Sequence, residues 1–218
     1  MPEDTSSSNR DISGWVAGYL EPSHAARVRA RLDNREPREV EPIDGYMPSN
    51  VGAELLAWWM SARGDKDMPA ADDVRMETLV ELAPYLRYLG WDGPERLIVR
   101  LFGTALSAGM GQDMTGQDLF GFGDYPDRGS DIARLKLLHS HPCGVVLFWE
   151  MADTAGGEHQ MELLTLPVGA GADGGNRLIG TVMPVHQEAR WESVLTYAEV
   201  PKLREAQFID LGFGVPSA

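Results

Sequence analysis

The stretch RLIVRLFGT, residues 96–104, indicates the fold most clearly. Its first seven residues are mostly apolar, and as a strand they would point alternately to two faces of a sheet, with Leu97, Val99 and Leu101 on one and Ile98, Arg100 and Phe102 on the other. Gly103 ends this run, and Thr104 is a suitable cap for a short helix that reaches about Met110. The pattern therefore predicts a strand that passes directly into a helix.

The flanking sequence extends this unit in both directions. Upstream, residues 85–91 are predicted to form a partner strand, joined to the first by the turn Asp92-Gly93-Pro94. Downstream we expect short helical pieces, one longer helix and three strands, at residues 111–125, 127–139, 144–152, 159–168 and 177–186. This order of elements is typical of a single α+β domain.

The strand expected at residues 144–152 is apolar on both faces, because Val145, Leu147 and Trp149 alternate with Val146 and Phe148. A sheet with one face in water would carry polar residues at alternate positions, so both faces should be covered. The second cover is either a helix predicted at residues 50–63 or a second subunit in a homodimer. The candidate covering residues are Leu55, Trp58 and Trp59.

Two segments carry a resemblance to a known family. The junction at residues 99–104, followed by Gly-Gln-Asp-Met-Thr-Gly at 111–116, resembles the stand-alone PAS proteins of alphaproteobacteria. The tryptophan-bearing helix upstream and the closing strands at 142–185 resemble that family too, over roughly residues 51–186. The resemblance implies a five-stranded antiparallel sheet with helices over one face, a cavity between them, and a role in bacterial regulation such as motility or cell-cycle control. The family's ligand is generally unassigned, so no residue role is carried over.

The domain organisation follows from this. We expect a disordered N-terminus at residues 1–12, a helical extension and linker at 13–48, a PAS-like domain with its lead-in helix at 49–186, and a C-terminal extension at 187–218 with a helix near 189–197.

Charge and composition exclude several classes of function. The formal net charge is −14, so the protein repels nucleic-acid backbones. A single cysteine, Cys143, fits a reducing compartment. The N-terminus lacks the basic start and the apolar stretch of a secretory signal, and no apolar segment reaches the length of a membrane span. A cytoplasmic protein is expected.

One set of residues is predicted to line a cavity between the long helix and the sheet. Arg100 interrupts an apolar strand, so it is either paired with a carboxylate inside the cavity or exposed at an edge of the sheet. Inside the cavity it would suit an anionic ligand such as a carboxylate, and it could instead pair with Glu150 across the sheet. The candidate set is Arg100, Phe102, Met114, Leu138, His139, Phe148, Glu150 and Met183.

The segment His139-Ser140-His141-Pro142-Cys143 contains the residues most suited to chemistry. A closed zinc site needs four ligands, and histidine near a helix end also interacts well with the helix dipole. Haem binding to His139 is disfavoured. A flavin photosensor would need its reactive cysteine in the short central helices, whereas Cys143 lies at the start of a strand. Neither a metal, a cofactor nor a catalytic residue is therefore assigned, and the protein is expected not to be an enzyme.

A basic cluster precedes the domain. Ser23 can cap a helix with Ala25, Val28 and Leu32 on one face, and the arginines nearby are Arg27, Arg29, Arg31, Arg35 and Arg38. A solvated helix face, an acidic partner, an anionic membrane and the acidic domain of a second copy are all compatible with this cluster.

Two functions fit the whole pattern. One is a sensor whose cavity binds a small ligand and passes the signal to a protein partner. The other is a docking or dimerisation module whose core is filled by side chains, for which Phe102, Met114, Phe120, Phe148 and Met183 supply bulk. A third hypothesis is an enzyme that uses His139, His141 and Cys143.

Overall fold

The computed structural model describes residue 46 and residues 48–121, 128–152, 158–185 and 202–216. The helices, 3-10 turns and strands, in chain order, are α3 (Asn50–Arg63), η1 (Ala71–Asp73), η2 (Met76–Thr78), η3 (Ala83–Tyr85), β1 (Leu86–Asp92), β2 (Arg96–Phe102), α4 (Thr104–Met110), α5 (Arg128–Ser140), β3 (Cys143–Ala152), β4 (Glu158–Val168), β5 (Arg177–Pro184) and β6 (Lys202–Asp210). In this part of the chain, no helix is both long and apolar enough to cross a bilayer.

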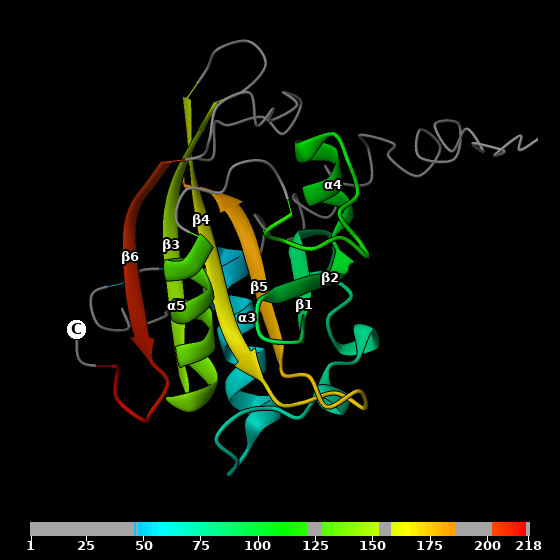
Figure 1. The fold of residues 1–218 in the computed structure, drawn as a ribbon, viewed down its shortest axis with the longest axis vertical. Coiled ribbons are helices and arrows are strands. Elements are labelled where there is room, and N and C mark those ends of the chain that lie inside the picture. Colours follow the sequence, from blue (N-terminus) through cyan, green and yellow to red (C-terminus); the bar gives the residue numbers. More distant parts are fainter. Residues whose placement is uncertain (1–45, 47, 122–127, 153–157, 186–201, 217–218) are drawn as a thin grey trace, which may run out of the picture.

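Six strands form one sheet in the order β2-β1-β5-β4-β3-β6, with all neighbours antiparallel (Figure 1). The expected α+β class is confirmed, but the expected number of five strands is wrong. The sixth strand, β6, pairs with β3 along the edge. It comes from the tail that was predicted to be a helical extension. The helix predicted near residues 189–197 and the segments 1–12 and 13–45 lie outside the described residues.

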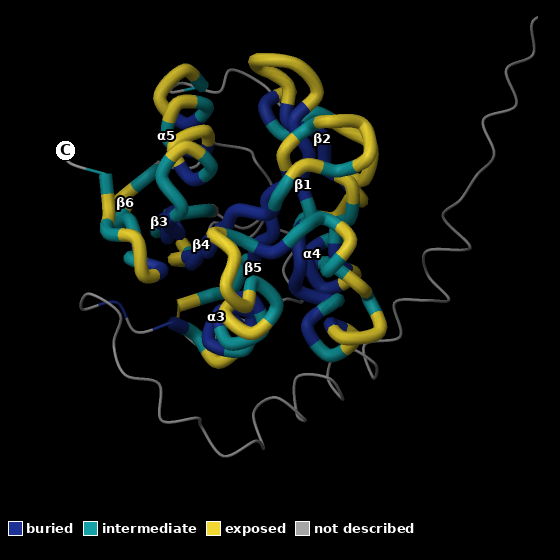
Figure 2. The backbone as a smooth tube through the Cα atoms, turned by 90° about the horizontal axis from the view of Figure 1, so that it is seen from below, coloured by how far each residue is buried: buried dark blue, intermediate teal, exposed yellow. Residues whose placement is uncertain are grey.

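The two faces of the sheet carry different helices. Seen from below, α5 lies on one side of the strands and α3 on the other (Figure 2). We call the α5 side the inner face and the α3 side the outer face. Val145 and Leu147 of β3 pack into the inner cluster and Val146 packs into the outer one. The prediction that both faces are covered is therefore confirmed, and α3 supplies the second cover.

The junction between β2 and α4 depends on one glycine. A Cβ atom at Gly103 would lie 2.2 Å from the Pro84 carbonyl oxygen, so a side chain at this position would collide with backbone. Gly103 is also the N-cap position of α4, and Thr104, which was expected to cap the helix, is instead its first residue. At the start of α3, Ser49 is the cap and accepts a hydrogen bond from the Gly52 N–H.

Candidate functional site

Large apolar side chains occupy the space between α5 and the inner face of the sheet, which we call the inner compartment. Leu135 and Leu138 of α5 pack there with residues from the central strands and from the segment after α4, each at most 9% exposed: Met114, Phe120, Leu147, Trp149, Met161 and Leu163. Of the predicted cavity residues, Met114 and Leu138 lie here, and the partly buried Phe102 packs against the same cluster.

The charged side chain of Arg87 lies on the inner face of the sheet. Arg87 of β1 is 7% exposed and lies opposite Phe102, and its Nη2 donates a hydrogen bond to Thr165 Oγ1 at 2.6 Å. Gly180 of β5 lies between Arg87 and Thr165 in the sheet. A Cβ atom there would be 3.3 Å from Arg87 Nε and 2.2 Å from the Leu164 carbonyl oxygen, so glycine leaves the path of the guanidinium open. Arg87 was not among the predicted residues, although it interrupts an apolar run as Arg100 does.

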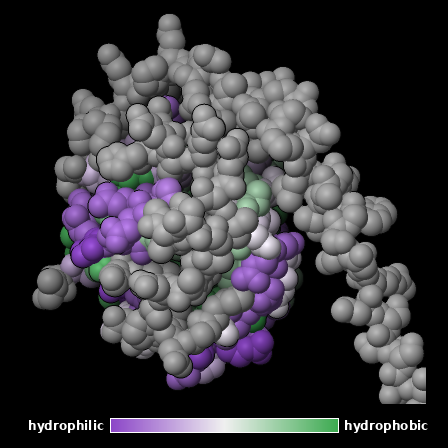
Figure 3. Space-filling view, turned by 90° about the horizontal axis from the view of Figure 1, so that it is seen from above, coloured by the Kyte–Doolittle hydropathy of each residue, from purple (hydrophilic) through white to green (hydrophobic). Residues whose placement is uncertain are grey.

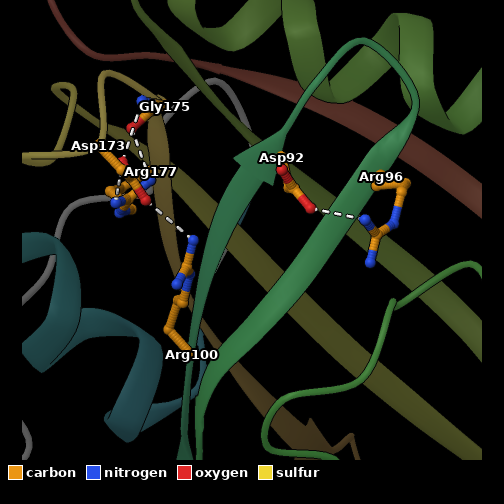
Figure 4. A network of polar contacts seen from close by, with 6 residues as sticks. All are labelled: Asp92, Arg96, Arg100, Asp173, Gly175 and Arg177. Atoms are coloured by element: carbon orange, nitrogen blue, oxygen red, sulfur yellow. Dashed lines mark hydrogen bonds and ion pairs between the residues drawn. The ribbon is translucent and has the colours of Figure 1, made fainter.

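Arg100 lies elsewhere. The register of β1 and β2 shifts between Tyr88 and Leu89, and Arg100 falls at this irregularity. Its side chain is 40% exposed and forms an ion pair with Asp173 in the β4–β5 loop, Nη2 to Oδ2 3.0 Å (Figure 4). Arg100 therefore does not face the inner compartment.

The same loop is organised by Arg177. Its guanidinium donates to Asp173 Oδ1 and to the Gly175 carbonyl oxygen, the latter at 2.6 Å (Figure 4). Hydrogen bonds from Arg177 and from the Gly175 N–H hold the pKa of Asp173 below its usual range. A separate exposed ion pair, Arg96 to Asp92, lies at the β1–β2 turn. These contacts order the loops at one end of the sheet.

Three other predicted cavity residues belong to the outer face. Phe148 and Met183 pack against the outer cluster, and Phe148 contacts the Tyr46 ring edge-on with centroids 6.4 Å apart. Glu150 pairs with Arg204 of β6. The predicted pairing of Arg100 with Glu150 is wrong, because β1, β5 and β4 separate their strands.

His139 ties α5 to the sheet. Its Nε2 lies 2.8 Å from the Arg177 carbonyl oxygen, and burial lowers the pKa of the imidazole. Cys143 is fully buried, and burial raises the pKa of its thiol to about 11. The Cys143 thiol is therefore protonated near neutral pH. In the described ranges no three side chains of the metal-binding types gather into a site.

The tryptophans of α3 have separate roles. Leu55 and Trp59 are fully buried against the outer face, and the Trp59 indole donates from Nε1 to the Pro167 carbonyl oxygen at 2.7 Å. Trp58 is only half-buried and lies on the flank of the helix. Trp59 therefore fixes α3 to β4, and Trp58 remains at the surface.

A buried carboxylate holds the start of α3. Glu162 of β4 is 4% exposed and accepts from Ser49 Oγ at 2.7 Å and from the Ser49 N–H at 3.1 Å. Burial raises the pKa of Glu162 despite these bonds. Burial also raises the pKa of the neighbouring Tyr46, and the charge of Glu162 raises it further by a smaller amount. This contact could not be predicted from local sequence, because Glu162 and Ser49 are 113 residues apart along the chain.

Comparison with protein families supports the fold. The profile of a family described as PAS domain matches residues 47–183, which is more than half of the chain. A solved structure titled "Structure of RsLOV D109G" is similar with 14% identity and a TM-score of 0.36, over 50% of this chain and 65% of that one. The similarity thus spans less than two thirds of that structure. Among curated proteins no sequence matches this chain.

Proposed function

The chain belongs to the PAS domain family, and we propose that it is a signalling module that acts through protein contacts, with its inner compartment filled by its own side chains. PAS domains are generally sensing or signalling modules and usually have no catalytic role. The observation that carries the proposal is the packing of the inner compartment. Leu138 is fully buried, Met161 is 2% exposed and Trp149 is 6% exposed, and all three belong to one continuous cluster.

This packing bears on ligand binding because a small-molecule pocket needs space. Such pockets have volumes of roughly 300–1,000 Å³. Side chains from α5, from β3 and β4 and from the segment after α4 converge between α5 and the sheet, where the family resemblance implied a cavity. To admit a ligand, several of them would have to leave their packed positions, which close-packed cores resist. Signal transfer by surface contacts does not require this rearrangement.

A small-ligand sensor is the second candidate, and Arg87 favours it. A guanidinium inside an apolar compartment suits a carboxylate or phosphate, which it can bind through two parallel hydrogen bonds. In this case the ligand would be anionic and would contact Arg87 beside Thr165. Arg87→Met would abolish its binding, and Arg87→Lys would weaken it.

Native mass spectrometry and an absorption spectrum of the full chain, purified from its own host, distinguish the filled signalling module from the small-ligand sensor. The proposal predicts the mass of the polypeptide alone, 23.9 kDa per chain, and only aromatic absorption. A bound small molecule at one copy per chain, lost in Arg87→Met, would contradict it and support the sensor.

Association of two copies and a place in the cytoplasm are further parts of the proposal. A homodimer would double the surfaces that a partner protein meets. Sedimentation that gives only the mass of one chain at high concentration would contradict the dimer, while leaving the filled compartment intact.

A further inference from the structure

A groove runs along the flank of α3 that is not packed on the sheet. Its volume is about 490 Å³. One wall is a single stripe of α3 with the spacing i, i+3, i+4 and i+7, formed by Glu54, Ala57, Trp58 and Ser61. The other wall is the segment at the end of η2 and after it, formed by Thr78, Leu79, Val80, Glu81 and Leu82. The sheet-facing residues of α3, such as Leu55 and Trp59, belong to a different stripe.

The groove combines apolar and acidic chemistry. Trp58 and Val80 supply the apolar part, and Val80 is 67% exposed. Glu54 and Glu81 place a carboxylate on each wall. The surroundings are acidic as well, since residues 50–82 contain seven acidic residues against three basic ones. A matching occupant would be a short helix with an apolar stripe beside a basic one.

The chain contains such a segment. We propose that residues 23–38, which lie outside the described ranges, bind in the α3 groove of the same chain. They contain five arginines against two acids. On a helix, the Ala25, Val28 and Leu32 stripe lies beside a stripe of Arg27 and Arg31, so one face can meet Trp58 and Val80 while the other meets the carboxylates. Among the atoms that are coloured in Figure 3, hydrophilic residues predominate and hydrophobic ones form small spots.

The linker length favours the groove of the same chain over that of a second copy. Tyr46 is held on the outer face against Phe148, so the stretch from Arg38 to Tyr46 sets the reach, which is roughly 26 Å for an extended chain. The whole of α3 is only about 21 Å long, so the groove, which begins within its second turn, lies within this reach. A segment tethered in this way has an effective concentration on the order of millimolar, which exceeds that of a second copy in dilute solution. The inference goes beyond the proposed function and holds whether or not a ligand occupies the inner compartment.

Disulfide trapping in the full chain tests the docking. The variant with Val28→Cys and Ala57→Cys brings two thiols together if the segment lies in the groove. The matched control combines Val28→Cys with Leu137→Cys, because Leu137 is 39% exposed on α5, across the sheet. The buried Cys143 is present in both. Under mild oxidation we expect an intrachain disulfide, identified by peptide mass spectrometry, to form at least tenfold faster in the first variant than in the control.

Charge reversal then identifies the cause. Adding Arg27→Glu and Arg31→Glu should slow trapping on the order of tenfold, because two favourable pairs become repulsive, whereas Arg27→Lys and Arg31→Lys should slow it little. Ser61→Cys replaces Ala57→Cys if the latter lowers the melting temperature. Equal rates in the groove and control variants would overturn the inference. So would a disulfide that links two chains, which would assign the groove to a second copy.

Discussion

Replacing Trp59 by phenylalanine should destabilise the protein strongly, because this side chain joins α3 to the outer face. Trp59 is fully buried, and its indole N–H donates to the Pro167 carbonyl oxygen at 2.7 Å. Phenylalanine cannot donate, so the buried carbonyl oxygen loses its partner at a cost of about 1–3 kcal/mol. The smaller ring leaves a gap that adds about 1 kcal/mol. The expected loss is therefore roughly 2–4 kcal/mol.

Urea unfolding followed by circular dichroism measures this loss. With a slope of about 2 kcal/mol per molar urea, the midpoint should fall by roughly 1–2 M. Trp58→Phe is the matched control, since it makes the same chemical change one residue away at a half-buried position, and its cost should stay below about 1 kcal/mol. Equal losses in the two variants would refute the role given to Trp59 and the covering of the outer face by α3.

Three other variants or probes test separate contacts. Gly180→Ala puts a Cβ atom 2.2 Å from the Leu164 carbonyl oxygen and should cost at least about 1–3 kcal/mol in urea unfolding, whereas the unhindered control Gly129→Ala should cost nothing; equal stabilities would contradict the close approach. Burial raises the pKa of the Glu162 carboxyl. The stability that this group contributes is therefore fully present below the pKa it has in the unfolded chain, and it is lost as pH rises through the pKa it has in the folded protein. The stability of the native protein relative to Glu162→Gln should therefore fall as pH rises above about 4, and a constant difference would contradict the burial of this carboxyl. Cys143, with its buried thiol of pKa about 11, should react with a thiol reagent at pH 8 only after unfolding, and rapid labelling of the native protein would show that β3 opens.

Local patterns in the sequence were sufficient for most of the elements. The alternation at residues 96–102 and the Gly103-Thr104 pair gave β2 and the start of α4, and the helix predicted at residues 50–63 has the bounds observed for α3. Apolar residues on both faces of β3 predicted two covers. These features are readable because each depends on residues close together in the chain.

The remaining features depend on registers that no local pattern contains. β6 pairs with β3 through a shift between Phe148 and Trp149, which breaks the period of two around Arg204 and hides the strand. A second shift, in β1 and β2, removes Arg100 from the inner face. Arg87 faces Thr165 only because β1, β5 and β4 are neighbours, an order set by the whole sheet.

Xenon binding tests the filled inner compartment most directly. Crystals of the native protein and of Leu138→Ala would be pressurised with xenon, which enters apolar cavities that lie empty. Leu138 is fully buried in the inner cluster, so its truncation creates such a cavity and serves as the positive control. We expect a xenon site between α5 and the sheet in Leu138→Ala and none there in the native protein. Xenon at that position in the native protein, at an occupancy similar to that in the variant, would contradict the account.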